Sequence, residues 1–543
     1  MKKTVFCSLF AIALILGLGF RLVRLDLRPM HHDEANQAIR FGTLLETGEY
    51  RYDKNDHHGP TLYYLTLPAA WVRGQETLSS LDEHTLRIVP AIFGGCLILL
   101  ICFLAKDLGQ LAIVFSAFLV SLSPALTYFS RFYIQESLLA FFILGFLIAL
   151  GRYLLHPNIV WALWTGVFAG LAYSTKETSV ILIINATVAC ILAGLLHKRS
   201  NTIPVHENTS SRDKENFQMS PGQSKSHIAA RSAHFFAAIG IAILIAVIFY
   251  TSFFRNPSGI LESIRAFGIY IDRGTDPGIH THPWSFYLRI LSFSSSEGVA
   301  WTEGLILVLA LAGLVFTFSA NRMAKKGMLS AVALFWLRYI ACYSVLTAAV
   351  FSIIRYKTPW NLIHFHIGFI LLAGCGASLL IQLPKTRVIR GLLIVVVVSA
   401  GCHLGLQNWK ANYRYPADTR NPYVYAQTSP DFLRLVRRVA DMAALHPDGT
   451  DMLIKVIADP HEQWPLPWYI RNMHRVGYWT NVAEAGRLDD APVLIASQEN
   501  AEELEAALGD RYISEFYGLR PWVLLTLHIE RPLWERFLKS TVN

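Results

Sequence analysis

Charge is scarce in this sequence of 543 residues. Asp, Glu, Lys and Arg together make up 16% of it, whereas hydrophobic residues make up 53%. A soluble protein usually carries about a quarter charged residues. The shortage lies in repeated apolar runs of about 20 residues, each long enough to cross roughly 30 Å of hydrocarbon. The composition therefore excludes an ordinary soluble protein and predicts a polytopic membrane protein.

Paired cysteines are also lacking. All seven cysteines fall in apolar runs, and none belongs to a CxxC motif. This distribution predicts small buried side chains and excludes both a disulfide framework and a cysteine zinc site. The net charge of +9 does not indicate nucleic-acid binding, because much of the excess lies in short loops between the apolar runs.

Eleven apolar runs predict spanning helices. The first follows Met1-Lys2-Lys3 and has no clear cleavage site after it, so we expect it to be retained. Basic residues gather in six alternate connecting segments, which predicts a multi-pass protein of the cell (inner or plasma) membrane with a cytoplasmic N-terminus. Arg21 at the end of the first run, and Arg24 and Arg28 after it, depart from this rule. The predicted spans are 4–22, 86–105, 109–128, 136–155, 159–175, 178–197, 233–253, 300–320, 329–353, 362–383 and 389–407.

The predicted domains are a transmembrane domain, 1–407, and an extracytoplasmic domain, 408–543. Outer loops 23–85 and 254–299 carry aromatic, histidine and acidic residues, whereas 198–231, rich in Ser, Asn and Gln, indicates a flexible cytoplasmic linker. The expected fold class is an all-α polytopic membrane protein of about eleven spans with a small C-terminal α/β soluble domain. In that domain strand-like runs (452–457, 492–496, 521–528) alternate with helix-like runs (430–444, 499–508, 532–539).

The first candidate for chemistry is His31-His32-Asp33-Glu34, soon after the first predicted span. One carboxylate of such a pair can take a proton from an acceptor hydroxyl, while the other holds a cation or orients the first. The alternative is purely structural, since acidic residues also favour the positive end of a helix dipole.

A second candidate in the same loop is the stretch His57-His58-Gly59-Pro60, which leads into Thr61-Leu62-Tyr63-Tyr64. Gly-Pro marks a turn, and the aromatic residues suit the membrane interface. Four histidines in one loop allow a metal site, but no pair has the HxxxH spacing that would favour one.

Charged pairs at the ends of predicted spans form two more candidates. Glu136 lies at the predicted membrane edge, where an unpaired charge would be costly, and Arg131 is its expected partner; snorkelling at the interface is the alternative. Lys176 and Glu177 lie in a very short connection between two apolar runs. They indicate either a turn or an anion site at which Lys176 meets a phosphate headgroup.

Two further candidates lie in the later outer segments. Arg355, Lys357 and Trp360 place two cations beside aromatic rings, which suits a lipid phosphate. The alternative is an ordinary stop signal at the end of a span. His280 and His282 form an HxH pair, for which lining a substrate site or a structural role is favoured over binding a metal.

All six candidates fall on the predicted outer side, although the orientation was assigned from other residues. Reactive side chains at one mouth of a helical bundle suit a site that meets one substrate in the lipid and another in water.

These stretches, HHDEA, HHGPTLYY, SRFYxQE, STKETS, HTHPWSFYLRI and RYKTPWN, resemble the GT-C superfamily of membrane glycosyltransferases. The nearest branches are the protein O-mannosyltransferases (glycosyltransferase family 39-like) and the aminoarabinose transferases. Closer still is a prokaryotic family labelled flippase-activity-associated. The resemblance covers about residues 25–435, and the soluble tail beyond it has no counterpart that we identify.

The resemblance implies an inverting transfer of a sugar from a polyprenyl phosphate to a glycan, lipid or protein acceptor at the outer face. By motif match Asp33 is the expected base and Glu34 its neighbour, and the catalytic pair is therefore Asp33 and Glu34. The expected substrate-binding residues are His58, Arg131, Glu136, Lys176, Glu177, His282, Arg355, Lys357 and Trp360. The resemblance leaves a divalent metal ion open, with Glu34, Glu136 and His280 as candidate ligands.

Two other functions fit parts of the same pattern. A translocation component would need the cations that bind the lipid phosphate, but not the Asp-Glu pair. A scaffold would depend on its outer tail and tolerate changes in the loop carboxylates.

Overall fold

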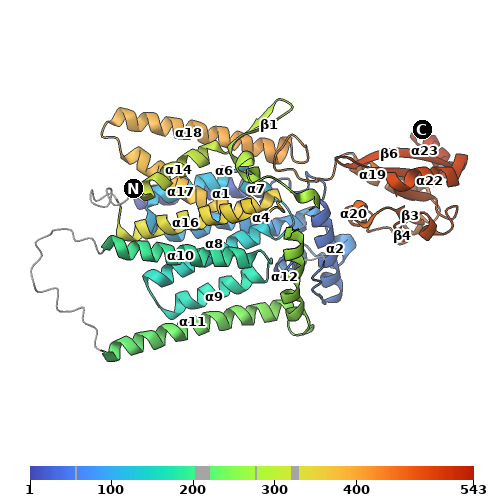
Figure 1. Ribbon diagram of the computed structural model, residues 1–543. Helices are drawn as coiled ribbons and strands as arrows, with labels where there is room; N and C mark the ends of the chain where they lie inside the picture. The colour runs from blue at the N-terminus through green and yellow to red at the C-terminus, as the bar shows by residue number, and fades with distance from the viewer. Residues whose placement is uncertain (56–57, 202–220, 276–277, 319–328, 543) are drawn as a thin grey trace, which may run out of the picture. The chain divides into compact units, whose positions relative to one another are not determined.

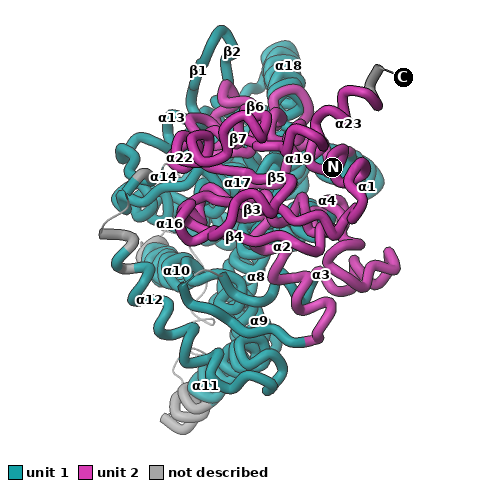
Figure 2. Tube along the Cα trace, turned by 90° about the vertical axis from the view of Figure 1, so that its right-hand side faces the viewer, with its two compact units in different colours: residues 1–23, 49–65, 88–412 teal, residues 24–48, 66–87, 413–543 magenta. Residues whose placement is uncertain are grey.

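The structure is a computed structural model that describes residues 1–55, 58–201, 221–275, 278–318 and 329–542 (Figure 1). It divides into two compact units (Figure 2). Unit 1 comprises residues 1–23, 49–65 and 88–412, and unit 2 comprises 24–48, 66–87 and 413–543. Of the predicted linker 198–231, residues 202–220 lie outside the described residues.

Unit 1 is a bundle of apolar helices. Two helices, α3 (Thr61–Val72) and α4 (Glu83–Ile101), begin in one unit and end in the other. The remaining elements of unit 1 are α1 (Lys3–Leu22), α5 (Ala105–Leu108), α6 (Gln110–Leu122), α7 (Pro124–Ser130), α8 (Glu136–Leu155), α9 (Ile159–Tyr173), α10 (Ser179–Asn201), α11 (Pro221–Tyr250), α12 (Gly259–Thr275), α13 (Phe286–Ser292), β1 (Ser294–Ser296), β2 (Val299–Trp301), α14 (Gly304–Phe318), α16 (Ala331–Ile353), α17 (Ile363–Gln382) and α18 (Arg387–Trp409).

The predicted membrane class is confirmed. Within the described residues, eight helices are long and apolar enough to cross a membrane, or nine if the bent pair α6 and α7 forms one span. Two other predicted spans are the shorter apolar helices α9 and α14, of 15 residues each. Every predicted apolar run therefore coincides with a helix or a bent helix pair, because uninterrupted apolar sequence satisfies its backbone groups within the helix.

A sharp bend of 58° separates α6 from α7. A break inside an apolar run exposes backbone N–H groups that need partners. Ser123 caps α7, and the buried carboxylate of Glu303 accepts hydrogen bonds from Ser123 Oγ (2.7 Å) and Ala125 N (2.9 Å). His366 Nε2 lies 2.8 Å from the same carboxylate. These contacts fix the bend from outside the bent segment.

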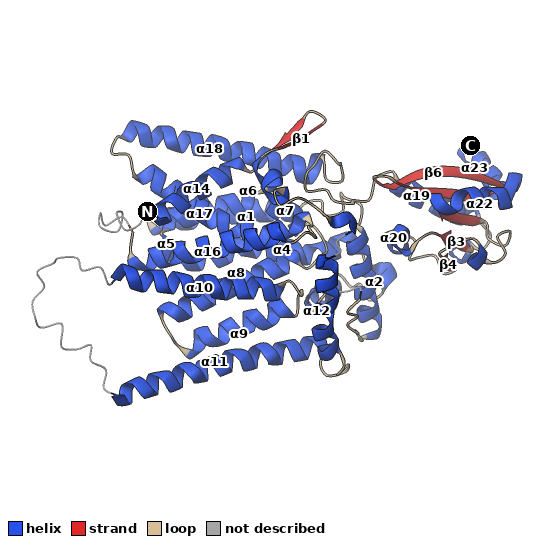
Figure 3. Cartoon of the chain, viewed as in Figure 1, coloured by secondary structure: helices blue, strands red, loops and turns tan. Residues whose placement is uncertain are grey.

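Unit 2 contains a five-stranded sheet with helices on both faces (Figure 3). The strand order is β4-β3-β5-β7-β6; β3 pairs in parallel with β4 and β5, and β7 is antiparallel to β5 and β6. Helices α19 and α23 pack on one face and α22 on the other. The bounds are α19 (Phe432–Leu445), β3 (Ile454–Ile457), α20 (Pro460–Gln463), α21 (Leu466–Tyr469), β4 (Val476–Trp479), β5 (Val493–Ser497), α22 (Gln498–Leu508), β6 (Tyr512–Arg520), β7 (Val523–Glu530) and α23 (Arg531–Val542).

The six elements that the sequence predicts in this tail are all present, and the prediction of a small α/β domain is confirmed. Two strands, β4 and β6, were not predicted. Strand β4 has only four residues, one of them Gly477, and strand β6 alternates poorly because a register shift interrupts it between Gly518 and Arg520. Both are the edge strands of the sheet, where the selection for a regular pattern is weaker.

Unit 2 also includes the helix α2 (His32–Thr47) and other parts of the first predicted outer loop. Tyr469 OH accepts a hydrogen bond from Met30 N (2.8 Å), and Trp468 Nε1 donates to Glu83 Oε1 (3.0 Å). Arg471 donates to the carbonyl of Leu81 (2.6 Å). The predicted boundary at 407/408 falls inside α18, whereas the units divide after residue 412 and share the outer loop between them.

Candidate functional site

The start of α2 positions the predicted catalytic pair. His31 caps the helix: its Nδ1 accepts a hydrogen bond from Asp33 N (3.1 Å), and its own backbone N–H donates to Glu34 Oε2 (3.0 Å). This reciprocal capping satisfies two backbone donors that the helix leaves unpaired. It also places both carboxylates in the first turn, where the helix dipole favours negative charge.

Glu34 is fully buried and bound by arginine. Arg87 donates from Nε to one carboxylate oxygen and from Nη2 to the other, each at 2.7 Å, and Arg28 lies 4.0 Å away. Burial by itself raises the pKa of Glu34, but the charges of Arg87 and Arg28 outweigh it and lower that pKa to about 2. Glu34 is therefore ionised and fully engaged, which makes it a poor acceptor for a substrate proton.

Asp33 differs from its neighbour in being open. Its side chain is 42% exposed, and its Oδ2 lies 3.7 Å from His31 Nδ1. A candidate base must reach the proton that it removes. Of the two predicted catalytic carboxylates, Asp33 is the one that a substrate can approach, and Glu34 holds the turn that carries it.

His58 and Glu177 come together in unit 1. The Glu177 carboxylate lies 2.9 Å from His58 Nδ1 and accepts a hydrogen bond from Tyr52 OH (2.9 Å). Burial raises the pKa of Glu177, but His58 and Tyr52 outweigh this effect and leave it below its ordinary value. Tyr270, on α12, lies 2.8 Å from the same histidine nitrogen. This cluster ties the first outer loop to the connection between α9 and α10.

Gly59 is the residue that permits this close packing. A side-chain Cβ at this position would lie 2.2 Å from the carbonyl oxygen of Ser174, which is backbone and has little freedom to move. Thr61 and Thr175 bond through their hydroxyls at 2.8 Å. The HGPT and STKE stretches, separated by more than a hundred residues, therefore form one packed layer.

Lys176 and Glu136 form a buried ion pair. The lysine charge is neutralised by this carboxylate, so Lys176 offers a phosphate less attraction than its charge suggests. Arg131 is also buried, and its Nη1 donates to the carbonyls of Phe20, Arg21 and Val23 at the end of α1. These three contacts make Arg131 a cap for that helix.

The two later outer segments pair with each other. Thr281 and Tyr356 form an antiparallel bridge, and Lys357 N donates to the carbonyl of His280 (3.0 Å). The Lys357 side chain is 1% exposed, and its Nζ donates to the carbonyls of His282 (3.1 Å) and Ile354. No carboxylate in the described part of the chain forms an ion pair with it. Lys357 is thus a buried cation with an unbalanced charge.

The remaining predicted residues surround this segment. Arg355 is exposed, Trp360 is buried against Phe129 (ring centroids 6.4 Å apart), and the His280 ring lies 4.6 Å from that of Tyr356. Among the described residues no group of three or more His, Cys, Asp or Glu side chains is arranged to hold a metal ion. The metal candidates Glu34, Glu136 and His280 belong to no such group, and the metal itself stays an untested expectation.

Sequence reasoning missed several residues on which these contacts depend. Arg87 lies just inside the predicted span 86–105, and a charge in that position indicates a partner elsewhere in the chain. Glu303 and His366 carried the same signal at the ends of two predicted spans. His461 and Trp464 lie in the tail, where no sequence pattern marked them.

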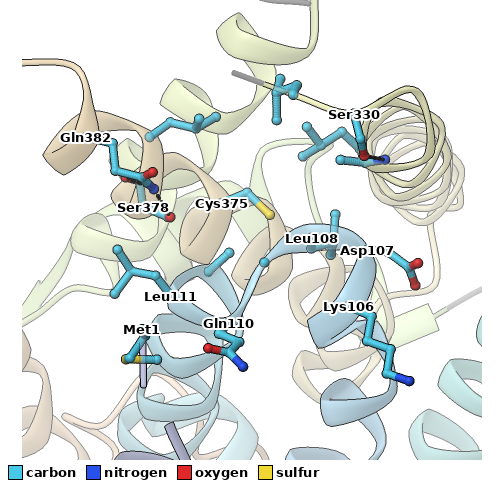
Figure 4. Close-up of a pocket in the computed structure, with 16 residues that line it drawn as sticks. Met1, Lys106, Asp107, Leu108, Gln110, Leu111, Ser330, Cys375, Ser378 and Gln382 are labelled. Carbon is cyan, nitrogen blue, oxygen red and sulfur yellow. Dashed lines mark hydrogen bonds between the residues drawn. The ribbon is translucent and has the colours of Figure 1, made fainter. Parts of the chain in front are cut away.

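A pocket of about 550 Å³ lies elsewhere in unit 1 (Figure 4). It is lined by the first residues of α16 and the last of α17, including Ser378 and Gln382, which are hydrogen-bonded at 2.8 Å. Lys357 and Trp360 lie at the opposite ends of the same two helices, about 30 Å away along helices of this length. None of the predicted site residues lines this pocket.

Comparison with known proteins finds one matching family and several solved structures with a similar fold. The family described as dolichyl-phosphate-mannose-protein mannosyltransferase matches residues 68–205. No curated protein sequence matches the chain. The crystal structure of ArnT from Cupriavidus metallidurans bound to undecaprenyl phosphate is similar, with a TM-score of 0.57 and 12% identity, over 98% of this chain and 99% of that one.

Two structures from Archaeoglobus fulgidus are similar as well. Its oligosaccharyltransferase in the apo form has a TM-score of 0.54 and 15% identity, over 100% of this chain and 78% of that one. AglB in complex with an inhibitory peptide and a dolichol-phosphate has a TM-score of 0.52 and 13% identity, over 98% of this chain and 77% of that one.

The closer resemblance to the flippase-activity-associated family is not tested by these matches and stays a prediction. The shared architecture confirms the fold that the resemblance to the GT-C superfamily predicts, and the family match covers residues 68–205 within it.

Proposed function

We propose that the protein is a glycosyltransferase that moves a sugar from a polyprenyl phosphate to an acceptor at the outer face of the cell membrane. The structures that it resembles include proteins with undecaprenyl phosphate or dolichol-phosphate bound. The proposed orientation has a cytoplasmic N-terminus and an extracytoplasmic C-terminal domain.

The proposal rests on the burial of Lys357, which forms no ion pair with a carboxylate of the described residues. Burying an ammonium group without a counter-charge is costly unless a ligand supplies the missing negative charge. Two of the three N–H donors of its Nζ meet carbonyl oxygens, which leaves one for a ligand. Arg355, exposed two residues earlier, adds a second cation from the same segment. A lipid phosphate is the anion that a membrane protein with such a site is expected to bind.

Transfer then proceeds as a single displacement. The acceptor hydroxyl attacks the anomeric carbon and gives its proton to Asp33, while the bond from that carbon to the phosphate oxygen breaks. The electron pair of that bond leaves with the polyprenyl phosphate, whose negative charge needs a cation to stabilise it. Attack opposite the leaving group inverts the anomeric centre.

Donor binding tests the cation assignment. With the full chain in lipid nanodiscs and undecaprenyl phosphate as the probe, Lys357→Met should weaken binding about tenfold to a hundredfold, as expected for a hydrogen bond to a charged group. Lys385→Met, which removes an exposed lysine, is the matched control and should leave the Kd unchanged. Equal Kd values for both variants would refute the role of Lys357.

Transfer itself tests the base. Asp33→Asn should slow transfer from a polyprenyl-phosphate sugar at least a hundredfold, because general-base catalysis contributes about that much, and should leave undecaprenyl phosphate binding intact. Asp26→Asn removes an exposed carboxylate from the same unit and should have no effect. Translocation of the lipid in vesicles without any transfer by the unaltered protein would favour the flippase-like function.

A further inference from the structure

We propose that unit 2 carries a saccharide-binding subsite beside Asp33, formed by the rings of His32, His461 and Trp464, and that the acceptor is therefore a glycan. This inference rests on the proposed function, and it specifies the class of the second substrate, which the fold leaves open.

Three aromatic rings from distant parts of the chain meet at this point. The His32 ring is stacked with that of His461 at 6.1 Å between centroids, with an angle of 26° between the planes. The Trp464 ring lies 5.9 Å from His32 on a tilt of 43°. His32 is the first residue of α2. His461 lies in α20, and Trp464 directly follows that helix. All three residues belong to unit 2.

The polar atoms of these rings are unused. No hydrogen bond joins the ring nitrogens of His32, His461 or Trp464 to any described residue. His461 is exposed, and Trp464 is only partly buried. Rings that stack through their faces and keep their nitrogens free present both an apolar surface and hydrogen-bonding groups to a ligand.

Arg520 adjoins the cluster through the backbone. Arg520 donates to the backbone carbonyl of His461 (3.1 Å), which fixes the position of that residue. Burial lowers the pKa of His32 to about 4, so its ring is neutral at pH 7. A neutral aromatic surface favours a ligand without a phosphate or a carboxylate in contact with it.

A sugar ring matches these properties. It has an apolar C–H face, which packs against aromatic rings, and hydroxyl groups at its edge, which pair with N–H donors and carboxylates. His32 is followed directly by Asp33, whose side chain is 42% exposed. A saccharide bound to the three rings therefore has its hydroxyls beside the proposed base, as an acceptor requires.

Binding measured without turnover tests this site. The full chain in lipid nanodiscs, carrying Asp33→Asn to prevent transfer, is mixed with methyl α-mannoside, methyl β-glucoside, methyl β-galactoside or a capped Ala-Thr-Ala peptide. Saturation-transfer difference NMR then reports which probe contacts the protein. At least one glycoside should give a signal, and Trp464→Ala and His461→Ala should each reduce it fivefold or more.

Control variants separate loss of the site from loss of the fold. Trp522→Ala removes a fully exposed tryptophan of the same unit and should leave the signal unchanged. Trp464→Phe keeps an aromatic face and should retain more binding than Trp464→Ala. Thermal unfolding of each variant verifies that unit 2 is intact.

The inference is overturned if no glycoside binds, if only the peptide binds, or if the glycoside signal survives both ring substitutions. These outcomes do not depend on turnover. Glycoside binding by a protein that transfers no sugar would leave the subsite in place and refute the proposed function alone.

Discussion

Glu34→Gln offers the sharpest test of how the site is built. The substitution preserves the shape of the side chain but removes its charge, and so leaves the Arg87 guanidinium buried beside a neutral amide. Arg87 also donates to the carbonyls of Leu25 and Arg28 at 2.7 and 2.8 Å. It therefore has no route to water, and the loss of its counter-charge is not relieved by a change of rotamer.

The magnitude follows from the shift in pKa. A fall from the ordinary 4.5 to about 2 corresponds to about 3 kcal/mol of stabilisation of the charged form. Breaking a buried ion pair by removal of one partner costs about 3–5 kcal/mol in other proteins. Both routes give about 3 kcal/mol for Glu34→Gln, which is more than a hundredfold in the equilibrium between closed and locally opened forms of α2.

Hydrogen exchange measures this equilibrium directly. In the full chain, backbone amides of α2 should exchange at least a hundredfold faster in Glu34→Gln than in the unaltered protein. Glu76→Gln, at an exposed position of unit 2, should leave those rates unchanged. If the α2 amides of Glu34→Gln exchange within threefold of the unaltered protein, the ion pair does not hold the helix start, and the account of Asp33 as a fixed base fails with it.

The pH dependence of hydrogen exchange in α2 provides a second test of the ion pair between Glu34 and Arg87. Because the pKa of Glu34 in the folded protein lies below its value in the unfolded chain, its contribution is complete above pH 4.5 and is lost as the pH falls toward 2. Glu34→Gln should abolish this part of the pH dependence of α2 exchange. A dependence that persists unchanged in the variant would assign it to other groups.

Two further predictions concern other parts of the structure. Burial lowers the pKa of both His32 and His528 from 6.5 to about 4, so the unfolded chain takes up protons first and unit 2 should lose stability as the pH falls from 6.5 to 4. Replacing either histidine by Gln should flatten this slope in hydrogen exchange. Gly59→Ala should lower the thermal unfolding temperature of unit 1, because its Cβ would overlap the Ser174 carbonyl; Gly240→Ala, where a Cβ meets no atom within 4 Å, should not.

These two predictions fail on distinct observations. If both histidine variants keep the slope of the unaltered protein between pH 6.5 and 4, neither histidine contributes to the loss of stability in that range. If the unfolding temperatures of Gly59→Ala and Gly240→Ala are equal, the layer formed by HGPT and STKE accommodates the added methyl group without loss of stability.

The helical part of the fold was predictable because its signal is local. Each apolar run contains its own reason to be a helix in a membrane: length, composition and the need to satisfy the backbone internally. The tail followed the same logic, and its three most apolar strands and three helices were found from periodicity. The edge strands β4 and β6 escaped, since short or irregular strands carry little periodicity of their own.

The partners of the charged residues were not predictable in the same way. The sequence predicted Arg131 as the partner of Glu136, and this prediction was wrong, because Lys176 pairs with Glu136 instead. Lys176 is neutralised by Glu136, Arg131 donates hydrogen bonds to the carbonyls at the end of α1, and Lys357 donates to only two carbonyls from a buried position. Equal charges in similar motifs thus have unequal capacity to bind an anion.

The sequence by itself determined the class of the protein, the positions of its helices and the residues in which chemistry is expected, because hydrophobic length and local motifs depend only on neighbours in the chain. Tertiary structure decided which of those residues are available. It engaged Glu34 with Arg87 and left Asp33 open, and it brought His461 and Trp464 to His32 across more than four hundred residues. Burial and ion pairing depend on contacts between distant segments, and no local pattern encodes them.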